Sequence, residues 1–224
     1  MQAEVAVIVA VKNSEAFLPD ALKSIRGQPG PSIDLIVVDG GSTDGSLAIA
    51  ARFDARILCE TAPGLANAWN TGVTESTAPF VAFLDSDDVW VADTLGRRIA
   101  ALGAAPRAGL AFGRVKHVIC EGRHLLPGPK REILLNERSS PIPGTMLIRR
   151  DVFARIGHFD PNYALAADTD WIARATNAGI VMQPIDLLVL IKRLHTNNLT
   201  RQVDRAQHEL LAILRRKIAG LPHG

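Results

Sequence analysis

The chain has 224 residues, and its 25 Lys and Arg against 23 Asp and Glu leave a formal net charge of +2. This length suits one large domain with a sizeable core, and so small a charge excludes the basic surface that nucleic-acid binding needs. No apolar run approaches the roughly 18 residues of a membrane span, and the amino terminus has no leader pattern. Cys59 and Cys120 stand far apart without CxxC spacing. We therefore expect a soluble, cytoplasmic protein with two inert, buried thiols.

The first half of the chain alternates apolar runs with helical patterns, which is typical of a mostly parallel sheet covered on both faces. Strands are predicted at residues 5–11, 33–40, 56–60 and 80–84. Helices are predicted between them, from Asn13 or Ser14 to Gly27, from Ser42 or Thr43 to Phe53, and between Pro63 and Ala78. Ligands on such sheets bind beyond the carboxyl ends of the strands, where Asp39 and Asp85 stand.

The second half is less regular. The patterns predict a helix over 89–102, one or two strands over 108–119, a strand and short helix within 144–160, a helix over 168–179 and a returning strand over 180–192. Residues 121–144 form a Pro- and Gly-rich connection, which is long for a compact domain and is a candidate mobile substrate loop. We expect one domain over 1–200, followed by a basic amphipathic helix and tail over 201–224.

Three aspartates, Asp85, Asp87 and Asp88, follow the apolar run of "FLDSDDV". Such a cluster is destabilised by mutual repulsion unless a cation lies among the carboxylates, and oxygen ligands in a D-x-D pattern suit Mn²⁺ or Mg²⁺. The chain has no GxxxxGK[ST] loop, and "DGGSTDG" does not match GxGxxG, so a diphosphate is expected to rest on the metal. The alternative without a ligand is that these aspartates cap a helix that starts at "VWVADTL".

Five motifs carry a resemblance by their order and spacing: "VAVIVAVKN", "IDLIVVDGGSTDGS", "GLANAWNTGV", "FVAFLDSDDVW" and "ADTDWIAR". Together they resemble the family 2 glycosyltransferases of GT-A fold over most of the chain. The resemblance implies a single α/β domain with a Rossmann-like mixed, mostly parallel sheet flanked by helices. It also implies an inverting transfer of a sugar from a nucleotide-diphosphate sugar to an acceptor hydroxyl, with the donor nucleotide on residues 1–100 and the acceptor on 101–200.

Carried over position by position, the resemblance assigns Asp168 as the general base and Asp87 as a metal ligand. The positions that it assigns to the nucleotide-sugar are Ala10, Lys12, Asp39, Asn67, Asp85 and Ser86. His195 follows the last predicted strand, where many family members carry a histidine near the metal or diphosphate, although a lone histidine also fits a structural role. Lys12 fits either a phosphate contact or a side chain that covers apolar surface.

Several positions leave alternatives open. Asp168 also fits a helix cap, and Asp170 is expected to cap or to pair with Arg174. Gly40 stands where the family often has a second acid, so the base of the nucleotide is not assigned. Ala167 stands where the family often has a Glu, which makes a non-catalytic nucleotide-sugar binding module the second hypothesis.

A third hypothesis is a haloacid dehalogenase-like phosphatase, because "FLDSDDV" fits the hhhhDxDx[TV] pattern. The late position of this run, after three predicted strands, argues against it. For the transferase, the implied partners are a donor nucleotide-diphosphate sugar, Mn²⁺ or Mg²⁺, and a lipid-linked or small-molecule acceptor. The basic tail fits a solvated face or a peripheral contact with an anionic inner-membrane surface. The oligomeric state is not readable from the sequence.

Overall fold

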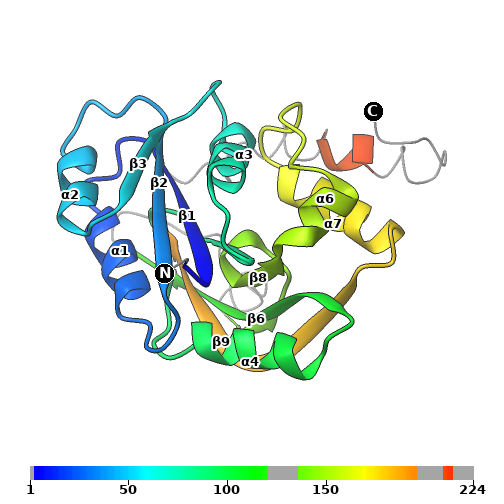
Figure 1. Ribbon diagram of the computed structural model, residues 1–224. Coiled ribbons are helices and arrows are strands. Elements are labelled where there is room, and N and C mark those ends of the chain that lie inside the picture. The colour runs from blue at the N-terminus through cyan, green and yellow to red at the C-terminus, as the bar shows by residue number, and fades with distance from the viewer. Residues whose placement is uncertain (1–2, 121–135, 196–208, 214–224) are drawn as a thin grey trace.

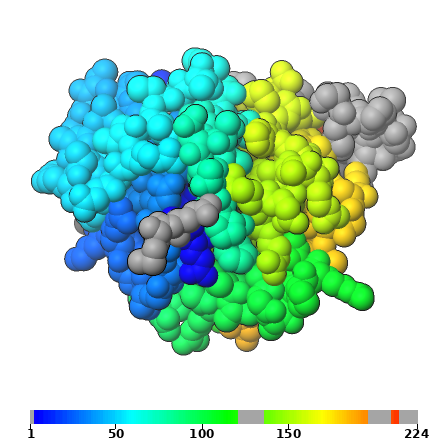
Figure 2. Space-filling model, in the orientation of Figure 1, coloured from blue at the N-terminus to red at the C-terminus, as the bar shows by residue number. Residues whose placement is uncertain are grey.

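The computed structural model describes residues 3–120, 136–195 and 209–213, which form a curled, mixed α/β sheet flanked by helices in one domain (Figure 1). This is the predicted fold class. In Figure 2 the blue-to-cyan amino-terminal residues fill one side of the face shown, and the yellow segment around 150–175 lies beside them. Within the described residues, no helix is both long and apolar enough to cross a membrane.

Nine strands join into one sheet in the described part of the chain, in the order β3-β2-β1-β4-β8-β6-β9-β5, with β7 paired to β6. Their bounds are Val5–Val11 (β1), Ile33–Asp39 (β2), Arg56–Cys59 (β3), Phe80–Phe83 (β4), Val89–Trp90 (β5), Ala108–Ile119 (β6), Arg138–Ser139 (β7), Met146–Arg149 (β8) and Val181–Leu194 (β9). The first four strands pair in parallel, and β8 enters antiparallel between β4 and β6. The carboxyl ends of β1, β2 and β4 therefore meet at one edge.

Helices cover both faces because the strands are apolar on both. The helices are Leu18–Arg26 (α1), Ser46–Arg52 (α2), Leu65–Glu75 (α3), Leu95–Ala104 (α4), Arg150–Ile156 (α6) and Ala167–Asn177 (α7), with a 3-10 turn at Pro143–Thr145 (η1). In β1, Val5, Val7 and Val9 pack with α1, α2 and α4, whereas Ala6 and Ile8 pack with α3, α6 and α7. This alternation follows from the two-residue period of a strand.

The predicted start of the helix at Val89 is wrong. Val89 and Trp90 form β5, which pairs antiparallel with β9, and the buried Trp90 Nε1 donates to the carbonyl of Gly144 (2.7 Å). Helix α4 begins only at Leu95, where the N–H groups of Thr94 and Leu95 donate to a side-chain oxygen of Gln28 (2.9 and 3.0 Å). The aspartates at 85–88 therefore cap no helix, and that alternative is wrong.

Other boundaries also move. Helix α1 starts at Leu18 and α2 at Ser46, each later than predicted. The reason for the second shift is local, since the Asp44 carboxylate accepts the N–H of Ser46 (3.0 Å) and holds the preceding residues in a loop.

Of three further predictions, one is wrong and two fall largely outside the described residues. The expectation of buried thiols is wrong, because Cys59 at the end of edge strand β3 is exposed and Cys120 is half-buried. Residues 121–135 of the predicted substrate loop lie outside the described residues. So does most of the predicted carboxyl-terminal helix, of which 209–213 is described and helical.

Candidate functional site

The acidic cluster lies where β4 ends. The N–H of Leu84 still donates to the carbonyl of Ile8 in β1 (3.1 Å), after which the chain leaves the sheet. The aspartates at 85, 87 and 88 each direct one carboxylate oxygen to within 4.8 Å of the others. Asp88 is buried, whereas Asp85 and Asp87 are half-buried. Three oxygen ligands so close together suit a hard divalent cation.

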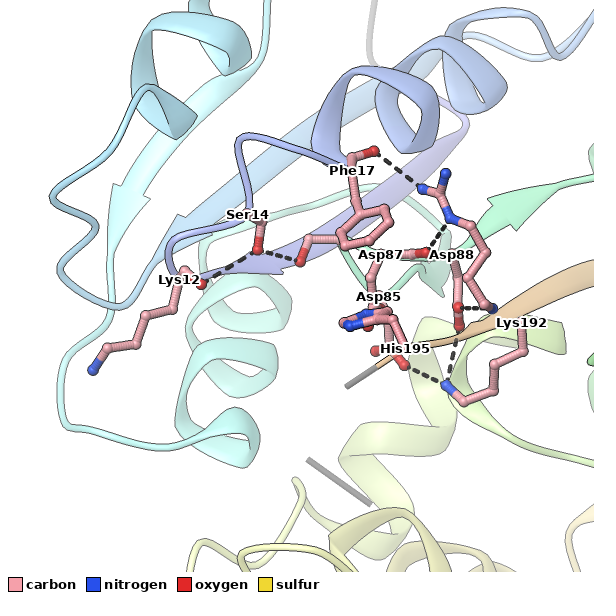
Figure 3. A network of polar contacts seen from close by, with 10 residues as sticks. Lys12, Ser14, Phe17, Asp85, Asp87, Asp88, Lys192 and His195 are labelled. Carbon is pink, nitrogen blue, oxygen red and sulfur yellow. Dashed lines mark hydrogen bonds and ion pairs between the residues drawn. The ribbon is translucent and has the colours of Figure 1, made fainter. Parts of the chain in front are cut away.

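The end of β9 supplies positive charge to this cluster (Figure 3). Lys192 Nζ bridges Asp85 Oδ2 (2.9 Å) and Asp88 Oδ2 (3.0 Å), and the N–H of Arg193 donates to Asp88 Oδ1 (2.8 Å). Burial raises the pKa of Asp88 to about 7, against the opposing effect of the Lys192 ammonium. Burial alone would lower the pKa of Lys192, but Asp85 and Asp88 outweigh it and hold that pKa above its usual value. Asp88 thus has both oxygens engaged by protein.

His195 and Arg193 close the cluster from the side of α1. His195 Nε2 lies 2.8 Å from Asp87 Oδ2, and its ring stacks on Phe17 with 4.5 Å between centroids. The Arg193 guanidinium lies 4.9 Å from the centre of the same Phe17 ring, donates to the backbone carbonyl of Asp87 and pairs with Asp20 (2.9 Å). The buried His195 is therefore brought beside the cluster although it is 108 residues distant from Asp87.

The other residues assigned after β1 and β4 divide into two groups. The Ser86 and Ser14 hydroxyls lie 2.8 Å apart and join the loop after β4 to the loop after β1. Lys12 is exposed and points away from the aspartates in Figure 3. Ala10 is half-buried in β1, opposite Val38 of β2. The structure thus brings Ser86, but not Lys12, to the acidic cluster.

A hollow of about 340 Å³ lies at the carboxyl ends of β2 and β3. Its lining residues are Asp39, Gly40, Gly41, Cys59, Glu60, Thr61, Ala62 and Pro63. The buried Asp39 carboxylate accepts the N–H groups of Gly41 and Ser42 at 3.1–3.2 Å, so its own loop holds it in place. Asn67 lies close by and donates to the carbonyl of Pro63 (3.0 Å).

Glu60 was not singled out from the sequence. A Cβ built on Gly40 would lie 3.3 Å from both oxygens of the Glu60 carboxylate. Glu60 also accepts the N–H of Gly64 (3.3 Å). The space beside Gly40, where a second acid was missing, therefore holds a carboxylate that comes from the end of β3. The available signal was an acidic residue at the end of a predicted strand.

Asp168 is the second residue of α7, and Ala166 occupies the cap position. The alternative in which Asp168 is the N-cap of the helix is therefore wrong, because the helix already includes Asp168. The Asp168 Oδ1 atom accepts the N–H of Thr169 (2.7 Å). Burial raises the pKa of Asp168; the Thr169 N–H opposes this, the charge of Asp85 adds to it and that of Lys192 lowers it. Asp168 therefore lies within electrostatic reach of the acidic cluster.

The neighbouring Asp170 has a separate role. It is buried and pairs with Arg174 at 2.8 Å, which confirms the predicted pairing four residues apart. Arg174 also donates to the backbone carbonyls of Ile156 and His158 and so joins α7 to the end of α6.

Comparison with known proteins identifies what this chain is similar to. Residues 6–157 match the model of the family described as Glycosyl transferase family 2. A curated relative from Mycobacterium bovis, named PGL/p-HBAD biosynthesis glycosyltransferase, is 32% identical over 193 residues, which cover 82% of this chain and 74% of the relative.

Two solved structures share the fold at low sequence identity. The 1–349 fragment of S. aureus TarS superposes with a TM-score of 0.68 at 21% identity, over 86% of this chain and 60% of that one. The mannosyltransferase PcManGT from Pyrobaculum calidifontis, in complex with GDP-Man and Mn²⁺, superposes with a TM-score of 0.72 at 21% identity, over 98% of this chain and 65% of that one. This chain thus spans less than two thirds of either structure.

Proposed function

Because the chain belongs to glycosyl transferase family 2, we propose that it is an inverting, metal-assisted transferase that moves a sugar from a nucleotide-diphosphate sugar to an acceptor hydroxyl. The observation that carries the proposal is that three carboxylates converge after β4 and that the half-buried Asp168 of α7 lies close enough for the charge of Asp85 to raise its pKa.

The donor nucleotide is proposed to lie across the ends of β1, β2 and β4. The hollow at Asp39 and Glu60 would take the nucleoside, and the cluster at 85–88 would take the diphosphate. The related structures were solved with UDP, UDP-GlcNAc or GDP-Man, so this fold accepts a uracil or a guanine base. For this chain both bases stay open.

The acidic cluster fits a divalent ion by its chemistry, since three carboxylates converge. The Lys192 ammonium that two of them share offsets part of their charge. Asp85 and Asp87 would hold Mn²⁺ or Mg²⁺, with His195 at the edge of the site, whereas Asp88 is engaged by Lys192 and Arg193. When bound, the metal would offset the charge of the departing nucleoside diphosphate. Lys192 would contribute a fixed positive charge to the same region.

Asp168 is proposed to take the proton from the acceptor hydroxyl. The hydroxyl oxygen would form its bond to the anomeric carbon on the face opposite the diphosphate, whose bond to that carbon breaks, so the configuration inverts. A base works best when its pKa lies near the operating pH. The pKa of Asp168 is shifted upward by burial, in the direction that strengthens a base.

The test is a thermal-shift screen followed by a transfer assay. UDP, GDP and their sugars, with and without Mn²⁺, should raise the melting temperature if they bind the folded chain, because such a ligand stabilises by mass action. The best donor is then incubated with lipid-linked and small-molecule acceptors, those of the PGL and p-HBAD type first.

Each alternative predicts a different result. Release of nucleoside diphosphate with formation of a glycoside supports the proposal. Donor binding with neither sugar transfer nor donor hydrolysis would favour a non-catalytic binding module. Hydrolysis of aryl phosphates would favour a phosphatase. The family match argues against the phosphatase.

A further inference from the structure

A distant side chain caps the amino-terminal end of α7. Glu209 Oε1 accepts the N–H of Ala164 (3.1 Å), and Oε2 accepts the N–H groups of Leu165 (2.9 Å) and Ala166 (3.0 Å). These three consecutive amides lead directly into α7, which begins at Ala167. The N–H of Ala166, at the cap position, lacks a partner within the helix. The Ala-Leu-Ala run also has no side-chain acceptor of its own. The Glu209 carboxylate meets that need.

The cap bears on Asp168. The acidic residues in the first turn of α7 are Asp168 and Asp170, and Arg174 holds Asp170. Asp168 Oδ1 already accepts the N–H of Thr169 within the first turn. Glu209 instead holds the amides of Ala164 to Ala166, which set the path by which the chain enters that turn.

An apolar contact holds the same segment. Ile213 is 6% exposed and belongs to the core cluster that includes Tyr163 and Trp171. Glu209 and Ile213 are four residues apart and so share one helical face, while Leu211 between them is 50% exposed. The segment is thus anchored by one polar and one apolar contact to the region around α7.

We propose that Glu209 is a positioning residue for Asp168. It fixes residues 164–166, and through them the first turn of α7, in the geometry from which Asp168 acts toward the acidic cluster. The inference rests on the proposed role of Asp168 as the base. It assigns a catalytic consequence to the segment 209–213, which lies in the tail whose sequence predicts a solvated or membrane-facing surface.

The first arm of the test measures hydrogen exchange in a peptide that covers residues 160–170. In Glu209→Ala, exchange of the three amides should be faster by about fivefold, the factor that corresponds to loss of a typical helix cap. Glu209→Gln retains a carbonyl acceptor and should lie between it and the parent. Leu211→Ala, an exposed change in the same segment, is the matched control and should leave exchange unchanged. Unchanged exchange in Glu209→Ala would overturn the proposal.

The second arm measures steady-state kinetics with UDP-GlcNAc or GDP-Man, whichever raises the melting temperature with Mn²⁺. Glu209→Ala should lower kcat by about fivefold with the donor KM unchanged, and Glu209→Gln should lower it less. If Glu209→Ala does not fold, the Gln variant carries both arms. A Glu209→Ala enzyme with faster exchange and the parental kcat would reduce Glu209 to a stabilising cap.

Asp168→Asn, run in parallel, separates this inference from the proposed function. If Asp168→Asn keeps the parental kcat, the base assignment fails and the positioning role fails with it. If Asp168→Asn is slow while Glu209→Ala is fully active, the base assignment stands and only the positioning role is refuted.

Discussion

The loop after β4 and the end of β9 form two sides of one site, and they carry opposite charge. The loop presents the three carboxylates in four consecutive positions, whereas β9 presents three cationic or protonatable side chains in four positions, Lys192, Arg193 and His195. Each side chain of the second set contacts the first across more than 100 residues of chain. The acidic loop presents carboxylate groups, and the contacts from the end of β9 determine which carboxylate oxygens are already engaged by protein.

The difference is clearest between Asp87 and Asp88. Both carboxylate oxygens of the buried Asp88 are engaged by β9, at 3.0 Å to Lys192 and 2.8 Å to Arg193. Asp87 is half-buried, and its side chain contacts His195, a group that can also ligate a metal. We infer that Asp88 joins the loop after β4 to β9, and that Asp87 serves to bind the metal ion.

The largest effect is expected from Asp168 in α7, whose pKa responds to the charges of both Asp85 and Lys192. Asp168→Asn should lower sugar transfer by about 100- to 10,000-fold, the range for loss of a positioned general base. Donor affinity should barely change, because the base contacts the acceptor. Transfer rate, donor KM and melting temperature are measured together. A stable variant that transfers at the parental rate would contradict the base role.

Substitutions at Asp87 and Asp88 should distinguish a metal-binding residue from one that stabilises the fold. Asp87→Ala should weaken Mn²⁺-dependent binding of nucleoside diphosphate by about 100-fold or more, since it removes a direct ligand. Asp88→Ala should instead lower the melting temperature by roughly 6–12 °C, because it leaves the Lys192 ammonium without its buried partner. Asp186→Ala, with a side chain 92% exposed, is the control. Equal nucleotide affinity in Asp87→Ala and the parent would contradict the role of Asp87 as a metal ligand.

Lys192 is expected to compete with the metal for Asp85. A unit charge about 4 Å away changes an interaction by roughly 1–4 kcal/mol, so Lys192→Met should tighten Mn²⁺ binding by about tenfold. The change is made in the Asp88→Asn background, which avoids a buried unpaired anion, and is compared with Asp88→Asn alone. Isothermal titration with Mn²⁺ alone gives the affinity, and exposed Lys116→Met in the same background is the control. Weaker Mn²⁺ binding in the double variant than in Asp88→Asn would mean that Lys192 supports the metal.

The pH dependence of transfer should report Asp168. Only the deprotonated carboxylate accepts a proton, and its pKa is raised from 3.8 by burial, so the rate should fall as pH drops through that raised pKa. Lys192 lowers the pKa of Asp168, so Lys192→Met in the Asp88→Asn background should move this acid limb to higher pH. The kcat is measured against pH in Asp88→Asn and in the Lys192→Met, Asp88→Asn double variant. A limb that stays in place would show that β9 does not act on Asp168.

The smallest effect is expected in the hollow at β2 and β3. If the Glu60 carboxylate accepts a hydrogen bond from the nucleoside, Glu60→Gln should weaken nucleoside diphosphate binding by about three- to tenfold. Exposed Glu75→Gln is the control. Titration of both variants with UDP and GDP gives the ratio for each base, and unchanged affinity for both nucleotides would exclude a direct role.

The sequence by itself determined the parallel half of the sheet and the acidic loop. Strands β1, β2 and β4 are short apolar runs whose composition predicts burial on both faces, whereas the edge strand β3 is partly exposed. The three aspartates lie within the four residues 85–88. Asp168 was found by a motif within one helix turn. Local patterns suffice here because neighbouring residues supply the whole signal.

Only the tertiary structure decided which residues complete the site. Trp90 enters a strand instead of a helix because β9 and Gly144 offer partners that its neighbours do not. Lys192 and Glu209 look like ordinary charged residues in sequence. Their roles come from carboxylates and amides brought close by folding, and a contact across 43 to 107 residues leaves no periodic trace in the chain.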